Sequence, residues 1–111
     1  MMINTVEEQA CTEQLARFFP KLPAARIGVR VSSRRSGQAR AQETTLLEFA
    51  SEEFGIFLCR LALEFDDRVE LVREGGGRPV EAAVIALQYQ AGSKAVAVRF
   101  LNGPCDWVNN R

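Results

Sequence analysis

The sequence contains no histidine among its 111 residues. Histidine is the commonest general base in enzymes, and it completes the Ser/His and Cys/His nucleophile pairs and most catalytic metal sites. Paired acids occur at Glu52-Glu53 and Asp66-Asp67, but adjacent residues of a turn or strand point in different directions, so neither pair resembles a general acid and base. We therefore expect a protein that binds and does not catalyse.

The chain also has few cysteines and no long apolar run. Cys11, Cys59 and Cys105 are odd in number and far apart, and they contain no CxxC pair, which argues against a disulfide framework and a zinc site. The longest apolar runs, such as 54–58 and 82–87, are far shorter than the roughly 20 residues that cross a bilayer. The N-terminus carries acids where a secretory signal has a basic start. These features predict a cytoplasmic protein with reduced cysteines, no metal or cofactor and no membrane partner.

Charge is unevenly distributed, although the formal net charge is zero. Residues 14–42 contain seven basic residues and no acid, whereas residues 43–81 contain ten acids and four arginines. Four basic residues lie on or just after one predicted strand: Arg26, Arg30, Arg34 and Arg35. Guanidinium groups hold phosphates through paired hydrogen bonds, so this run is a candidate site for an anionic nucleotide. The alternative is that hairpin partners carry opposite charges to pair across strands and to oppose aggregation.

Extended nucleic acids are a poor match to the same arginine run. Single-stranded nucleic acids bind to basic grooves in which aromatic side chains stack on successive bases. The aromatic residues of this chain do not interleave with the arginines. We therefore expect no nucleic acid polymer as a partner.

The first part of the chain predicts a helix and then an extended connection. Thr5 and Glu8 form a capping-box pattern, and apolar residues recur at nearly helical spacing up to Pro20, which predicts a helix over about residues 6–18. Residues 21–25 contain Pro23 and predict an extended segment. The expected organisation is an N-terminal helix and connection over residues 1–20 and a β-barrel domain over residues 21–111.

Six segments have the pattern of β-strands. They are residues 26–32, 39–49, 54–58, 68–73, 80–89 and 96–100, and the glycine run 75–77 is one of the turns between them. In the second segment we expect an inward face that includes Ala39, Ala41, Thr45, Leu47 and Phe49. Segment 54–58 is apolar enough to be buried on both sides. Six strands joined by short turns hide their edges best in a small, partly closed antiparallel barrel, and one place for the helix is an end of that barrel.

Several stretches carry the pattern of a known family. Residues 43–58 look like a second strand, a serine-containing turn and a third strand, residues 61–71 look like a loop and a fourth strand, and residues 80–84 and 96–101 match the last two long strands. In these stretches the chain resembles a PilZ domain, a six-stranded barrel family associated with the bacterial second messenger cyclic di-GMP. The resemblance covers about residues 21–107 and implies the barrel fold and a role in bacterial signalling.

Ligand binding in PilZ domains depends on an RxxxR motif before the first strand and a [DN]xSxxG motif before the third. In this chain the first motif corresponds to residues 22–26, where Arg26 alone matches, and the second to residues 49–54, where Ser51 alone matches and Gly55 follows one position late. Residues 30–34 also spell RxxxR, but inside the first hairpin. With the arginine run, the candidate ligand-binding residues are Arg26, Arg30, Arg34, Arg35, Ser51 and Gly55.

Two functions follow from these patterns. The leading hypothesis is a non-catalytic PilZ-like adaptor of bacterial signalling that contacts a protein partner and does not bind cyclic di-GMP in the family manner. The alternative is a receptor for cyclic di-GMP, or for another anionic nucleotide, that uses the arginine-rich first hairpin. A homodimer is a further expectation if Leu15, Phe18 and Phe19 are exposed on the N-terminal helix. The sequence leaves open whether Phe49 and Phe54 fill the former ligand site.

Overall fold

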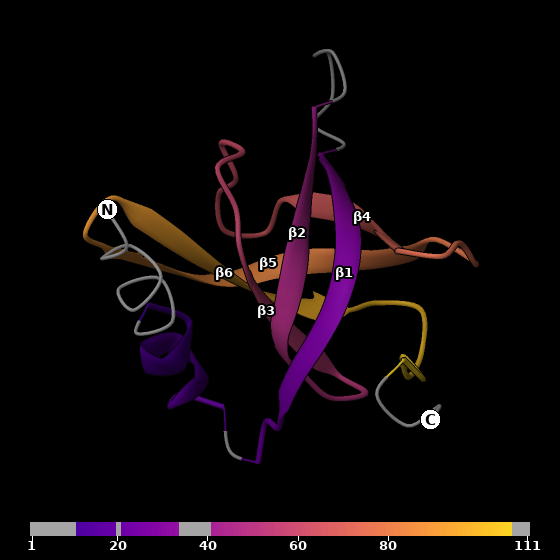
Figure 1. Cartoon of the computed structure of the whole chain (residues 1–111), viewed down its shortest axis with the longest axis horizontal. Coiled ribbons are helices and arrows are strands. Elements are labelled where there is room, and N and C mark those ends of the chain that lie inside the picture. The colour runs from indigo at the N-terminus through magenta and orange to yellow at the C-terminus, as the bar shows by residue number, and fades with distance from the viewer. Residues whose placement is uncertain (1–10, 20, 34–40, 108–111) are drawn as a thin grey trace.

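The strands form one sheet that closes on itself. The computed structural model describes residues 11–19, 21–33 and 41–107. Its strands are β1 (Ala24–Ser33), β2 (Gln42–Ala50), β3 (Phe54–Leu58), β4 (Arg68–Arg73), β5 (Val80–Gln90) and β6 (Ser93–Phe100). They are ordered β1-β2-β3-β6-β5-β4, and the antiparallel pairing of β1 with β4 closes the barrel (Figure 1). The predicted six-stranded antiparallel barrel with a short N-terminal helix is confirmed.

Two of the six strands have the predicted bounds, three are longer than predicted, and β2 differs because it begins at Gln42, so Ala41 lies outside it. β3 and β4 span the predicted residues. β1 begins at Ala24, within the segment predicted as a connection, because Ala24 pairs with Phe49 of β2. β6 begins at Ser93 because Ser93 pairs with Gln90 across the β5–β6 turn. No helix within the described ranges is long and apolar enough to span a bilayer.

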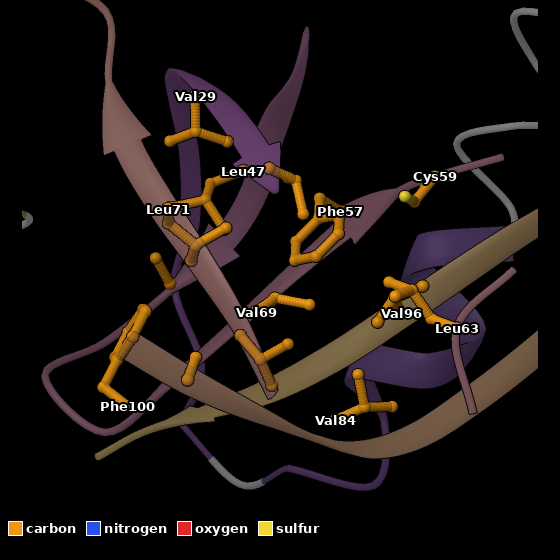
Figure 2. Close-up of a cluster of buried hydrophobic side chains, with 14 of the residues drawn as sticks. Val29, Leu47, Phe57, Cys59, Leu63, Val69, Leu71, Val84, Val96 and Phe100 are labelled. Atoms are coloured by element: carbon orange, nitrogen blue, oxygen red, sulfur yellow. The ribbon is translucent and has the colours of Figure 1, made fainter. Parts of the chain in front are cut away.

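The interior of the barrel is filled by alternate residues of all six strands. Val29 and Val31 of β1 point inward as predicted, while Arg26 and Arg30 are exposed. Figure 2 shows Leu47, Phe57, Val69 and Leu71 directed toward one another between the strands. Trp107 packs back on this core, and its ring lies 6.4 Å from the Phe100 ring in an edge-on arrangement.

The inward face of β2 differs from the prediction. Leu47 is buried in the barrel, but Phe49 lies in a second apolar cluster on the other face, and Ala41 is exposed. The cause is a β-bulge, because the register between β2 and β3 shifts between Leu47 and Phe49 and breaks the strict alternation of side chains. Ala50, instead of Phe49, reaches the interior. Ala39 lies outside the described residues.

The N-terminal helix packs on the outer face of the barrel and not at one of its ends. Within the described part of the chain it spans residues 11–16, and the predicted start near residue 6 lies outside that part. Cys11 and Leu15 of the helix are buried against Ile56 of β3 and against Ala95 and Ala97 of β6. The two alanines have small side chains, so the helix approaches the sheet closely. β3 is therefore buried on both faces, as predicted.

This arrangement corrects the expectation of an exposed apolar helix face. Leu15 is buried, and Phe19 is half-buried against the barrel. Phe18 alone of the three predicted contact residues is exposed, with 74% of its surface accessible. Of the three side chains expected to form a homodimer contact, Phe18 is therefore the one that is available to a second copy of the chain.

We expect Phe57→Ala to destabilise the barrel by roughly 3–5 kcal/mol, because the ring of Phe57 is fully buried and its removal leaves a cavity. The matched control is Phe65→Ala, since Phe65 is 71% exposed, and its effect should stay below about 0.5 kcal/mol. Urea denaturation followed by circular dichroism measures both changes. Similar effects of the two variants would contradict the assignment of Phe57 to the core.

Candidate functional site

The predicted arginines divide between described and undescribed segments. Arg26 and Arg30 are exposed on β1, where Arg30 lies opposite Thr44 of β2 and Val72 of β4. Within the described residues, neither guanidinium forms an ion pair with a carboxylate. Arg34 and Arg35 lie outside the described residues. The two described arginines are thus accessible to an anion, but they line none of the three pockets described below.

Ser51 shapes the turn between β2 and β3. Its hydroxyl oxygen accepts hydrogen bonds from the backbone amides of Glu53 and Phe54, both at 3.2 Å, and its own amide donates to the Phe54 carbonyl at 2.8 Å. Ser51 also lines an open pocket of about 700 Å³. The charged residues around this pocket are of both signs: Lys21, Glu52, Glu53 and Arg99. The serine therefore has a structural role in a turn whose surface is not selectively basic.

Gly55 is a packing residue in this structure. It is buried, and a Cβ atom at this position would lie 2.8 Å from Cδ2 of Leu47 and 3.2 Å from Cζ of Phe100. Those two side chains belong to the barrel interior. Gly55 is therefore required by the core, and its presence carries no information about a ligand.

Three residues at the positions that the resemblance aligns with the two motifs make apolar contacts with the N-terminal segment, although Ser51 and Phe54 also line the open pocket and Arg26 is exposed. Phe54, in the second motif, has its ring 5.3 Å from the ring of Phe19. Phe49, also in the second motif, and Leu22, in the first, pack in the same cluster as Cys11 and Leu15 of the helix. Phe49 and Phe54 thus bind the chain's own helix segment.

Polar contacts fix the same helix to the barrel. The Thr12 hydroxyl donates to the Glu48 carboxylate at 2.7 Å, and Glu48 is the residue between Leu47 and Phe49 at the bulge. The Cys11 thiol donates to the Gln88 carbonyl at 3.3 Å, and the Gln88 side chain donates to that of Gln14 at 3.2 Å. Thr12 is fully buried, so its hydrogen bond to Glu48 offsets the cost of removing the hydroxyl from water.

The cysteines are free, buried and protonated. Burial is the main cause that raises the pKa of all three thiols. It raises the pKa of Cys59 to about 12, and the nearby Glu43 carboxylate adds to the rise. Thiolates are the reactive form of cysteine, so these residues are not activated nucleophiles. Cys59 and Cys105 belong to the core of the barrel, where they are packing residues.

A network of polar contacts joins β2 to the segment after β3. Glu43 accepts hydrogen bonds from the Arg60 amide at 2.7 Å and from the Cys59 thiol at 3.5 Å. Lys94 donates to the Leu61 carbonyl. Glu43, Cys59 and Lys94 line a pocket of about 580 Å³, but their polar groups are engaged with the chain itself. Within the described residues, no three His, Cys, Asp or Glu side chains gather as metal ligands.

The sequence analysis missed a third pocket, which lies between the β4–β5 turn and the C-terminal segment. Its volume is about 690 Å³, and Arg73, Arg78 and Trp107 line it. The signal in the sequence was the pair of arginines on either side of the glycine run 75–77. The glycine run predicts only a turn. No pattern in the neighbouring residues predicts that Trp107, which comes thirty positions after Gly77, packs beside this turn.

Comparisons of the chain with protein-family models, with curated proteins and with solved structures found no match in any of the three. The resemblance to PilZ domains therefore depends on the chain's own residues.

We expect Gly55→Ala to destabilise the protein by about 1–3 kcal/mol, because the added Cβ overlaps packed core side chains. The matched control is Gly28→Ala, where the new methyl group would meet only the flexible side chain of Glu74. Urea midpoints of the two variants measure the difference. A Gly55→Ala protein as stable as the Gly28→Ala protein would contradict the packing role.

The raised pKa of Cys59 predicts a loss of stability in alkali. Below pH 9 the thiol is protonated in both the folded and the unfolded states. As the pH rises from 9.0 toward about 12, the unfolded thiol loses its proton first, so unfolding becomes more favourable. Thermal melts of the wild type and of Cys59→Ala across this range should show a shallower decline in the variant. Parallel declines would refute the raised pKa.

Proposed function

We propose that this chain is a non-catalytic, PilZ-like adaptor of bacterial signalling that contacts a protein partner and does not bind cyclic di-GMP through the two family motifs. One observation carries the proposal: the chain's own N-terminal segment packs on the residues at both motif positions. Leu22 stands where the family has an arginine, Phe49 where it has an acid or amide, and Phe54 where it has a glycine, so all three positions carry apolar side chains. The proposed location is the cytoplasm, where buried free thiols stay reduced.

The loss of the motif residues has a large energetic effect. A charge-assisted hydrogen bond of the kind an arginine makes to phosphate contributes roughly 1.5–3 kcal/mol, or about ten- to a hundred-fold in affinity. The first motif retains Arg26 without its partner arginine, and the second has Phe49 in place of a polar residue. Two such losses would move a micromolar ligand out of the useful range of concentration.

The proposed role without catalysis is supported by side-chain chemistry. The sequence contains no histidine. Burial raises the pKa of each cysteine thiol, so the protonated form predominates near neutral pH. A binding role requires none of these catalytic groups, because a partner contacts the surface of the barrel.

The closed barrel restricts how a partner protein can bind. Strand addition requires an unpaired sheet edge, and the β1–β4 pairing removes that edge over its length. A partner must therefore contact side chains. Three aromatic side chains are well exposed: Phe18 (74%), Phe65 (71%) and Tyr89 (69%). Aromatic residues are enriched at interfaces and dominate their energetics, so these three are the proposed contacts.

The test is capture by the tagged full chain from native lysate, with chemical cross-linking. The variants are Phe18→Ser, Phe65→Ser and Tyr89→Ser, and Arg68→Ser is the control because Arg68 is exposed and charged. We expect the wild type and the control to retain the same protein, and at least one aromatic variant to lose about tenfold or more of it. Melting temperatures should be unchanged in all four variants. No retention above a tag-only background, or equal retention by all variants, would contradict the proposal.

The second candidate function is a receptor for cyclic di-GMP or another anionic nucleotide. The exposure of Arg26 and Arg30 on β1, without ion pairs to described residues, favours it. The double variant Arg26→Ala/Arg30→Ala should then abolish nucleotide binding in calorimetry, while Arg68→Ala should leave it unchanged. Equal affinity of the double variant and the wild type would remove this candidate.

A further inference from the structure

The pocket beside the β4–β5 turn combines groups that recognise phosphate with an aromatic ring. Arg73, at the end of β4, and Arg78, after the glycine run, both line it. Within the described ranges, neither guanidinium forms an ion pair with a carboxylate. Arginine holds phosphate bidentately, and two arginines at one pocket form a strong site for such a group.

The acids near this pocket leave the two arginines available. The Glu74 carboxylate lies over Gly28 of β1 and does not line the pocket. Glu81 accepts a hydrogen bond from the Asn102 amide at 3.5 Å and does not line the pocket. Asp106 is the acid in the lining, and it forms no ion pair to Arg73 or Arg78 among the described residues. The balance of charge in the lining is positive.

The wall opposite the arginines is held in place by the barrel. The Leu101 amide donates to the Glu81 carbonyl and the Cys105 amide to the Glu52 carbonyl, both at 2.9 Å. Cys105 itself is buried in the core cluster of the barrel. The Trp107 indole is fixed by its edge-on contact with Phe100. The pocket is therefore largely preformed, which reduces the entropy lost on binding.

The glycines of the turn allow a ligand to approach the backbone. Gly76 and Gly77 line the pocket with φ angles of 95° and 121°, conformations that residues with a side chain rarely adopt. Figure 1 shows the β4–β5 turn and the C-terminal segment on the same side of the barrel. The volume of about 690 Å³ lies within the range of sites for small organic ligands.

We infer that this pocket binds a nucleoside monophosphate, with the phosphate held by Arg73 and Arg78 and the base stacked on Trp107. A base has a flat π-face that stacks on an indole whatever its identity. Asp106 is placed to accept a hydrogen bond from a ribose hydroxyl or an exocyclic amine. The site contains none of the six residues predicted from the sequence, and it is independent of the proposed protein partner.

Trp107 provides a direct readout, because it is the only tryptophan in the chain. The full-length protein is titrated with adenosine monophosphate, inorganic phosphate and adenosine, and its fluorescence is corrected with free tryptophan for absorption by the base. We expect a saturable change with adenosine monophosphate and affinities at least tenfold weaker for phosphate and for adenosine. No saturable change with the monophosphate, or equal affinity for phosphate alone, would overturn the inference.

The variant pair is Arg78→Ala and Arg68→Ala. Both arginines are exposed, and only Arg78 lines the pocket, so neither change should prevent folding. Loss of the Arg78 contact should weaken binding of adenosine monophosphate about tenfold or more, while Arg68→Ala should bind like the wild type. An equal effect of the two variants would show that binding depends on overall charge and would refute the site.

Discussion

The packing of Phe19 on Phe54 joins the N-terminal segment to the β2–β3 turn, and the arrangement of this side of the barrel depends on it. It places Cys11 and Leu15 over Ile56, Ala95 and Ala97, so β3 and β6 are buried on both faces. The bulge in β2 contributes to the packing of the helix on the barrel. It brings Glu48 within hydrogen-bond distance of Thr12, and it turns the Phe49 side chain toward the helix. Removing the apolar surface of the helix from water drives this docking.

This contact gives the PilZ resemblance a physical interpretation. The strand pattern that resembles the family encodes a barrel, and a barrel needs apolar residues at alternating positions, whatever it binds. The residues that would contact a ligand instead form the seat of the helix, as Phe49 and Phe54 do, or belong to the core, as Gly55 does. The proposed adaptor role follows from the barrel fold combined with apolar packing at positions where the resemblance implies polar ligand contacts.

The sequence predicted the parts of the fold that depend on local pattern. Three features could be predicted because each follows from residues adjacent in the chain. They are the alternation of buried and exposed side chains in β1, the burial of both faces of β3, and the packing roles of Cys59 and Cys105. The bulge was not readable, since a single extra residue at Glu48 leaves the apolar composition of the strand unchanged. The position of the helix and the pocket at Arg73, Arg78 and Trp107 depend on segments far apart in sequence, which only tertiary pairing brings together.

The central proposal is that apolar packing at Leu22, Phe49 and Phe54 prevents the chain from binding cyclic di-GMP through the positions of the two motifs. The most direct measurement is an amide NMR titration of the full chain with cyclic di-GMP at low salt, where contacts between arginine and phosphate are strongest. The account predicts that the amides of residues 22–26 and 49–55 keep their chemical shifts throughout the titration. Saturable shifts in both segments would contradict it and would identify the protein as a receptor for the second messenger.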